Sequence, residues 1–240
     1  MRLDKFLAHT GFGTRKGVKG LIKGKQVMIG DTIAKDGKQQ VKPDVDTVYV
    51  RGEAVKYQEF IYLMMHKPQG VVSATIDNVS QTVIELLQPE EQLVGPFPVG
   101  RLDKDTEGLL LITNDGTLAH NLLSPKKHVD KCYQATISGI VTKEQQDRFK
   151  MGIILKDGFN CQPAELEIIE VDDAQQQSEI KITIHEGKFH QVKRMFEAVE
   201  QKVIYLKRLS MGPLKLDEQL ALGEYRPLTE AELELLTEYK

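Results

Sequence analysis

A charged loop between two glycines holds the residues of this chain that are best suited to chemistry. The loop spans residues 100–108, which read Gly-Arg-Leu-Asp-Lys-Asp-Thr-Glu-Gly, and it runs directly into an apolar segment at 109–113. Four consecutive apolar residues at the start of that segment indicate a strand that is buried on both faces. A rigid, buried strand next to a charged loop is a common means of presenting a reactive side chain.

Three interpretations of this loop compete. Asp103 or Thr106 could cap a turn or a short helix, which is the commonest role of such residues. Calcium binding is the second, because acids and a glycine occupy positions one, three, five and six of an EF-hand loop: Asp103, Asp105, Glu107 and Gly108. Position twelve needs a bidentate glutamate but is Asn114, and the flanking segments are not helical in pattern, which argues against calcium. The third interpretation is catalysis by a single carboxylate.

Two further segments carry residues that could bind a substrate. Tyr133 follows Lys131 and Cys132 at the start of a predicted strand, where a tyrosine most often packs against its neighbours. Residues 188–199 are predicted to form a helix in which Phe189, Val192, Phe196 and Val199 make an apolar stripe. On another side of that helix we expect a polar group of three residues: His190, Lys193 and Glu197. By itself this pattern indicates an ordinary amphipathic helix.

The loop motif as a whole resembles a known signature. Gly100-Arg101-Leu102-Asp103, then Thr106 and Gly108, then Leu-Leu-Leu-Ile-Thr is similar to the motif of RsuA-type pseudouridine synthases, which isomerise uridine in ribosomal RNA. The resemblance extends over nearly the whole chain and is strongest at 98–116 and 186–196. It implies that Asp103 is the catalytic residue, which either attacks C1′ of the ribose or removes the proton at C2′.

The resemblance also implies partners for Asp103. Lys193 stands where many relatives carry arginine, and we expect it to pair with Asp103 as a point charge, since lysine cannot form a bidentate fork. Arg194 suits that role less well. Tyr133 is expected to stack on the target base, and His190 to be a helix-surface residue that contacts RNA rather than a general base.

Two further residues acquire expected roles from the resemblance. Arg101 is expected to contact or replace the flipped nucleotide, and its structural alternative is a surface ion pair with Asp105 or Glu107. Leu209 is expected to line the base pocket. The family's reaction needs neither a metal nor a cofactor, and we expect none here.

Charge is distributed unevenly along the chain. Residues 1–59 contain twelve Lys/Arg and seven Asp/Glu, a net +5, whereas the remainder holds twenty against twenty-eight, a net −8. The basic part therefore predicts a module that binds a polyanion. The cations of this part that are expected to contact RNA are Arg2, Arg15, Lys16, Lys19 and Lys23.

Local patterns predict the structure of this basic module. Leu3, Phe6 and Leu7 recur at helical spacing, and Thr14 is a plausible cap for a second helix, along which Arg15, Lys19 and Lys23 would form a stripe. Short strands are predicted at 26–30 and 47–51. This arrangement resembles the S4 RNA-binding domain. The Asn-Gly turn that is usual after the first strand is Ile-Gly here.

The predicted fold class is α+β: an S4-like domain at 1–58, then a pseudouridine synthase catalytic domain at 59–240 with a mixed, largely antiparallel sheet. Strands are expected at 60–65, 109–113, 133–138, 164–170, 179–185 and 202–209. Helices are expected at 117–123, 142–150, 188–199 and 229–238, the last begun by a capping box of Thr229 and Glu232.

Composition limits the class of protein. No apolar run approaches the roughly 20 residues that span a bilayer, and the N-terminus has no hydrophobic signal region, so we expect a cytoplasmic protein. The sequence does not indicate an oligomeric state, and a monomer is the default. Cys132 and Cys161 have no close-spaced partner that would indicate zinc. Segments at 125–128, 190–196 and 223–229 resemble the small-subunit branch of the family more than the large-subunit branch, and this resemblance implies 16S rRNA as the partner. A synthase acting on 23S rRNA and a non-catalytic rRNA-binding factor are the alternatives.

Overall fold

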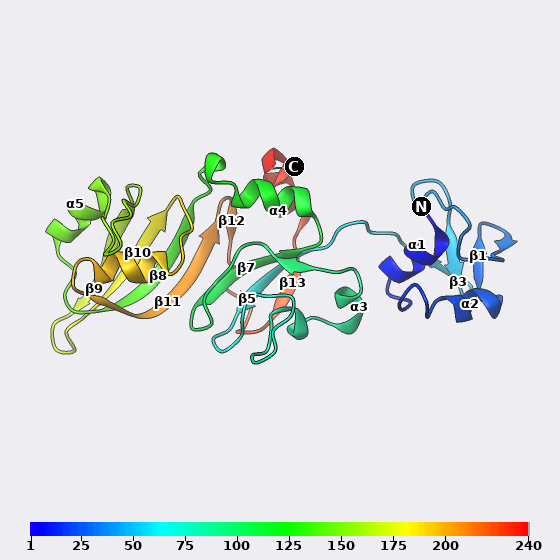
Figure 1. Cartoon of the computed structure of the whole chain (residues 1–240), viewed down its shortest axis with the longest axis horizontal. Helices are drawn as coiled ribbons and strands as arrows, with labels where there is room; N and C mark the ends of the chain where they lie inside the picture. The colour runs from blue at the N-terminus through cyan, green and yellow to red at the C-terminus, as the bar shows by residue number, and fades with distance from the viewer. Residues whose placement is uncertain (240) are drawn as a thin grey trace. The chain divides into compact units, whose positions relative to one another are not determined.

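The computed structural model describes residues 1–239, which divide into two compact units (Figure 1). The first unit comprises Met1–Ile61 with Ile84–Phe97, and the second comprises Tyr62–Val83 with Pro98–Lys240. Among the described residues, no helix is long and apolar enough to cross a membrane. The sequence-based division at residues 58 and 59 stays a prediction.

The first unit contains a small antiparallel sheet with two helices packed on a common core. Its elements are α1 (Leu3–His9), α2 (Lys19–Lys23), β1 (Val27–Ile29), β2 (Thr32–Ile33), β3 (Val48–Val50), β4 (Glu53–Val55), η1 (Ile84–Leu86) and α3 (Pro89–Gln92). The strands lie in the order β2-β1-β3-β4. Leu3, Phe6 and Leu7 are buried in one cluster with Val18 and Ile22, so the predicted helical spacing is confirmed.

The second helix is shorter than the sequence pattern predicted. Turns occupy residues 15–18, and α2 begins only at Lys19. Thr14 does act as a local cap, since its Oγ1 accepts the N–H of Gly17 at 3.1 Å. Gly17 and Gly20 lower the helix propensity of this segment, and Arg15 therefore precedes the helix instead of standing on its face. The predicted three-cation stripe along one helix is wrong.

The second unit is built on one mixed sheet. Its strands are β5 (Tyr62–Lys67), β6 (Phe97–Pro98), β7 (Glu107–Thr113), β8 (Lys131–Ser138), β9 (Glu165–Asp172), β10 (Gln177–Ile184), β11 (Lys202–Met211), β12 (Leu214–Lys215) and β13 (Tyr225–Pro227). The main order is β13-β5-β7-β11-β8-β10-β9, and only β7 and β11 run parallel. Each predicted strand is present, and the mixed, largely antiparallel α+β class is confirmed.

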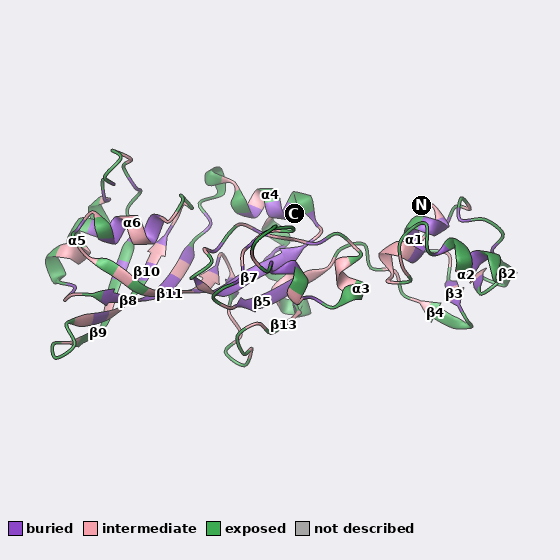
Figure 2. Ribbon diagram, turned by 60° about the horizontal axis from the view of Figure 1, so that its bottom comes forward, coloured by how far each residue is buried: buried purple, intermediate pink, exposed green. Residues whose placement is uncertain are grey.

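The helices cover parts of this sheet. They are α4 (Gly116–Leu123), η2 (Pro125–Lys127), α5 (Lys143–Met151), α6 (Gln191–Glu197), α7 (Glu230–Leu235) and η3 (Thr237–Tyr239). The rings of Phe149 in α5 and Phe196 in α6 meet at 4.9 Å between centroids, and both are buried. Figure 2 shows β5 and β7 as buried strands, as the apolar run at 109–113 predicted.

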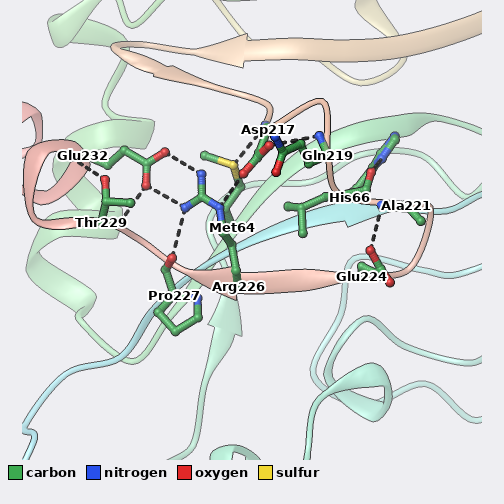
Figure 3. A network of polar contacts seen from close by, with 11 residues as sticks. Met64, His66, Asp217, Gln219, Ala221, Glu224, Arg226, Pro227, Thr229 and Glu232 are labelled. Carbon is green, nitrogen blue, oxygen red and sulfur yellow. Dashed lines mark hydrogen bonds and ion pairs between the residues drawn. The ribbon is translucent and has the colours of Figure 1, made fainter.

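An arginine near the C-terminus connects β13 to α7 through hydrogen bonds (Figure 3). Arg226 in β13 donates to Asp217 at 2.7 Å and to both carboxylate oxygens of Glu232 at 2.8 and 2.9 Å. Glu232 also accepts the N–H of Thr229, whose Oγ1 accepts the N–H of Glu232 in return, so the predicted capping box is confirmed. These bonds hold α7 against the strand that borders β5.

Candidate active site

A cleft of about 1040 Å³ opens in the second unit around the charged loop. Its walls come from the loop at 100–106, from β8, β10 and β11, and from the segment that leads into α6. Four residues selected from the sequence line it: Arg101, Asp103, Tyr133 and Lys193. The cleft therefore brings together side chains that are distant in the chain, such as Asp103 and Lys193, which are ninety positions apart.

Asp103 is half-buried and forms an ion pair with Lys193. Lys193 Nζ lies 3.0 Å from Asp103 Oδ2 and 2.6 Å from Asp105 Oδ1. The expected contact between Lys193 and Asp103 is confirmed. Burial works against the charge on Lys193, but hydrogen bonds to Asp105 and Asp103 raise its pKa overall. The hydrogen bond from Lys193 to Asp105 also lowers the pKa of Asp105, so Lys193 and Asp105 are both charged at neutral pH.

A buried lysine holds the backbone of the loop. Lys67, at the end of β5, has no exposed surface, and its Nζ donates to the carbonyl oxygens of Pro68, Asp103 and Thr106 at 2.9, 3.0 and 2.9 Å. Burial lowers the pKa of Lys67 to about 8. Sequence analysis missed this residue. The available signal was a lysine at the end of a largely apolar strand, directly before a proline.

Two more contacts shape the loop. Ser73 Oγ accepts the N–H of Leu102 at 3.1 Å and donates to its carbonyl at 3.0 Å. The carbonyl of Asp103 accepts the N–H of Thr106 at 3.0 Å, which closes a turn through the backbone. The Asp103 carboxylate is left to face Lys193 in the cleft, as the catalytic interpretation requires.

His190 lies closer to Asp103 than the sequence predicted. The helix α6 begins at Gln191, and His190 precedes it with a left-handed backbone (φ 50°). Its Nε2 therefore reaches to 3.3 Å from Asp103 Oδ1, and the predicted position on a helix surface is wrong. Phe189 also lies outside the helix and is 70% exposed, so it does not belong to the apolar stripe. A positive φ cannot be read from residue spacing, which explains both errors.

Tyr133 stands beside two buried cations. It lies in β8 directly opposite Arg208 of β11, and only 8% of it is exposed. Arg208 is buried, donates through Nε to the carbonyl of Leu109 at 2.8 Å, and has no partner for Nη2 among the described residues. Burial and the nearby Arg208 lower the pKa of Lys131, which also lines the cleft. One wall of the cleft is thus positively charged.

Gly108 allows β7 and β11 to approach each other closely at the end of the charged loop. Its φ is 112°, and a Cβ atom at this position would lie 2.2 Å from the carbonyl oxygen of Arg208. The backbones of β7 and β11 meet here in the only parallel pairing of the described sheet, with Gly108 opposite Arg208. Glycine is therefore required on steric grounds.

Leu209 is not among the residues that line the cleft. Leu206 and Arg208 line it instead, because alternate residues of β11 face the cleft and the pairing register shifts between Arg208 and Ser210. The expected position of Leu209 in the base pocket is therefore wrong. A bulge of this kind depends on the partner strand and leaves no mark in the spacing of β11 itself.

Arg101 and Arg194 occupy distinct environments. Arg101 is exposed at the cleft and makes no hydrogen bond or ion pair within residues 1–239. The alternative role, a surface ion pair of Arg101 with Asp105 or Glu107, is not present among the described residues. Asp105 pairs with Lys193, and Glu107 accepts a hydrogen bond from the hydroxyl of Tyr205 at 2.7 Å. Arg194 pairs with Asp157, away from Asp103.

The candidate RNA-binding cations of the first unit form two groups. Arg2 and Arg15 lie 2.6 and 3.0 Å from the buried carboxylate of Asp4. Burial favours the neutral form of Asp4, but the hydrogen bonds from Arg2 and Arg15 hold its pKa below the usual value. The second group, Lys16, Lys19 and Lys23, is exposed and forms no ion pair within the described chain. Whether these residues bind RNA stays a prediction.

Comparison with known families agrees with this geometry. The model of the RNA pseudouridylate synthase family matches residues 61–198, and the S4 domain matches residues 1–46. The chain belongs to the RNA pseudouridylate synthase family. Members of this family are isomerases that act on RNA. No group of three or more His, Cys, Asp or Glu side chains that could hold a metal ion occurs in the described part of this synthase.

Several relatives span the full length of the synthase. An uncharacterised RNA pseudouridine synthase of Bacillus subtilis is 55% identical over 99% of both chains. The ribosomal small subunit pseudouridine synthase A of Vibrio cholerae is 41% identical over 97% of this chain and 98% of its own. The ribosomal large subunit pseudouridine synthase B of B. subtilis is 38% identical over 98% and 95%. A crystal structure of a pseudouridylate synthase superposes with a TM-score of 0.68 at 37% identity, covering 99% of this chain and all of that one.

Proposed function

We propose that this synthase converts a uridine of 16S rRNA into pseudouridine, with Asp103 as the catalytic residue. The observation that carries the proposal is the Asp103–Lys193 ion pair of 3.0 Å in a cleft large enough for an extruded nucleotide. An ionised carboxylate at this position can attack C1′ of the ribose or remove the proton at C2′. The Lys193 ammonium, 3.0 Å away, stabilises negative charge on this carboxylate as the entering base displaces water.

The other cleft residues take roles in holding the nucleotide. The reaction breaks the N1–C1′ bond, turns the base and joins C5 to C1′; the proton at C5 passes to solvent and N1 acquires one. Tyr133 stacks on the base during this turn, and Arg101 contacts the extruded nucleotide or fills the space that it leaves. Arg2, Arg15 and the lysines 16, 19 and 23 bind the phosphate backbone of the RNA.

Two lines of support favour the small-subunit RNA. The segments 125–128, 190–196 and 223–229 resemble the small-subunit branch of the family, and the V. cholerae relative is named for the small subunit. The B. subtilis relative named for the large subunit is only slightly less similar, so a 23S target is the alternative. A non-catalytic rRNA-binding factor would have no use for the grouping of Asp103, Lys193 and Tyr133 in one cleft.

Release of tritium from C5 of uridine tests the proposal. The enzyme is incubated with 16S and with 23S transcripts labelled at that carbon, and the label in solvent is counted. We expect release from 16S rRNA alone, and no release with Asp103→Asn, which should bind the RNA with nearly unchanged affinity. Release from 23S rRNA alone would assign the enzyme to the large subunit. Turnover by Asp103→Asn would exclude Asp103 as the catalytic residue.

A further inference from the structure

An aromatic pair stands exposed at the wall of the cleft. The rings of Phe189 and His190 lie 3.7 Å apart between centroids, with 20° between their planes. Phe189 is 70% exposed and makes no other ring contact in the part of the chain that the structure describes. One face of its ring is therefore covered by the imidazole, while much of the rest faces water.

The pair is adjacent to the proposed catalytic residue. His190 Nε2 lies 3.3 Å from Asp103 Oδ1, and both aromatic residues line the same cleft. The left-handed backbone of His190 (φ 50°) turns the pair out of the apolar face of α6. Phe189 thus stacks on the imidazole whose Nε2 contacts the carboxylate of Asp103. The neighbouring Lys188 forms no ion pair in the described chain and favours the approach of a polyanion.

Extraction of a uridine leaves an apolar surface that such a pair could cover. When a nucleotide is turned out of its stack, the bases on either side lose a stacking partner. The two rings, with centroids 3.7 Å apart and 20° between their planes, are stacked much as neighbouring bases are, and the outer face of Phe189 is open to a base. Aromatic side chains bind unpaired bases in this way with little regard to base identity, since every base has a flat face.

We propose that Phe189 is a stacking platform for an unpaired nucleobase immediately next to the uridine held at Asp103. This inference rests on the proposed function, because it requires an RNA with an extruded uridine in the cleft. His190 supports the platform from behind. Phe189 thereby selects RNA whose residues beside the target are free to leave a helix, and it does not read their sequence.

Binding measurements with paired changes in protein and RNA test the platform. The RNA is a fragment of whichever transcript releases tritium, and dissociation constants are measured in the Asp103→Asn background. Phe189→Leu keeps an apolar side chain but removes the flat ring, Phe189→Tyr keeps the ring, and Ile169→Ala removes another exposed apolar side chain, on β9. Each protein is tested with the intact RNA and with two RNAs that lack the base directly 5′ or 3′ of the target.

Phe189→Leu should weaken binding of the intact RNA about 5- to 150-fold, as expected for the loss of one stacked base. On one of the two abasic RNAs this difference should vanish, and Phe189→Tyr and Ile169→Ala should bind as the parent does. Equal affinities of parent and Phe189→Leu, or a loss that persists on both abasic RNAs, would overturn the platform alone. Turnover of Phe189→Leu is measured separately with Asp103 intact. A fall in its kcat at saturating RNA, with unchanged affinity in the Asp103→Asn background, would make Phe189 a structural support for His190 and would also overturn the platform. Absence of tritium release from both transcripts would instead overturn the proposed function, and the platform with it.

Discussion

Replacement of Lys67 with methionine tests how the loop that carries Asp103 is held. Methionine has nearly the same length and is apolar, so it can fill the buried site without the charge. The change removes three hydrogen bonds from Nζ to the carbonyl oxygens of Pro68, Asp103 and Thr106. Two of these carbonyls belong to the loop itself, so the loss acts directly on the position of the Asp103 carboxylate.

The size of the effect follows from these three bonds. A buried carbonyl that loses its donor costs about 1–3 kcal/mol, which makes about 3–9 kcal/mol for three. Removal of the ammonium also ends the cost of burying a charge, which is several kcal/mol and offsets part of this loss. We expect a net destabilisation of about 3 kcal/mol. For a unit of this size it corresponds to a decrease of roughly 6–12 °C in melting temperature.

Catalysis should suffer more than stability. A shift of about 1 Å in a group that reacts with the substrate can lower the rate about 100-fold, and we expect a fall of that size in kcat. Thermal unfolding and tritium release measure the two effects, each at a temperature where the variant is folded. The matched control is Lys104→Met, which removes an exposed lysine of the same loop that donates only to Ser80. If Lys67→Met melted with the parent and kept its full kcat, the positioning argument for Lys67 would fail.

The remaining predictions concern the strand contact at Gly108, the ion pair of Lys193 and the pH dependence that follows from the pKa of Lys67. Gly108→Ala should destabilise the protein by at least 2 kcal/mol, because the new Cβ would lie 2.2 Å from the Arg208 carbonyl; an unchanged urea midpoint would contradict this. Lys193→Met should lower kcat at least tenfold, whereas Lys193→Arg should keep most of the parent's kcat because arginine preserves the positive charge beside Asp103. Single-turnover rates measure this difference, and equal rates for the two variants would count against a role of the ion pair. Activity should fall as pH rises through about 8, because a neutral Lys67 amine has two N–H groups for three carbonyls. Because the pKa of Lys67 in the folded protein lies below its ordinary value, the unfolded chain binds one more proton between about pH 8 and 10.5. Deprotonation of Lys67 therefore makes the free energy of unfolding rise with pH while activity falls. A melting temperature that fell together with activity over that range would indicate another cause.

Patterns local in sequence predicted the elements of the fold. The apolar runs at 109–113 and 133–138 are strands, and Thr229 with Glu232 begins the last helix as a capping box. These features succeed because each depends on residues within a few positions of one another. The three-residue strands β4 and β13 were missed because they read Glu-Ala-Val and Tyr-Arg-Pro, without the apolar run that marked β1 and β3.

The sequence by itself determined which side chains are available to a site: a charged loop carries Asp103, a strand carries Tyr133 and a basic segment carries Lys193. Only the tertiary structure decided which of them meet, and which residues hold them. The backbone of His190 turns its imidazole toward Asp103, the bulge after Arg208 excludes Leu209 from the cleft, and Lys67 joins β5 to a loop thirty-six positions away. The physical reason is that these contacts depend on backbone angles and strand pairing between distant parts of the chain, and neither is encoded in the spacing of a single segment.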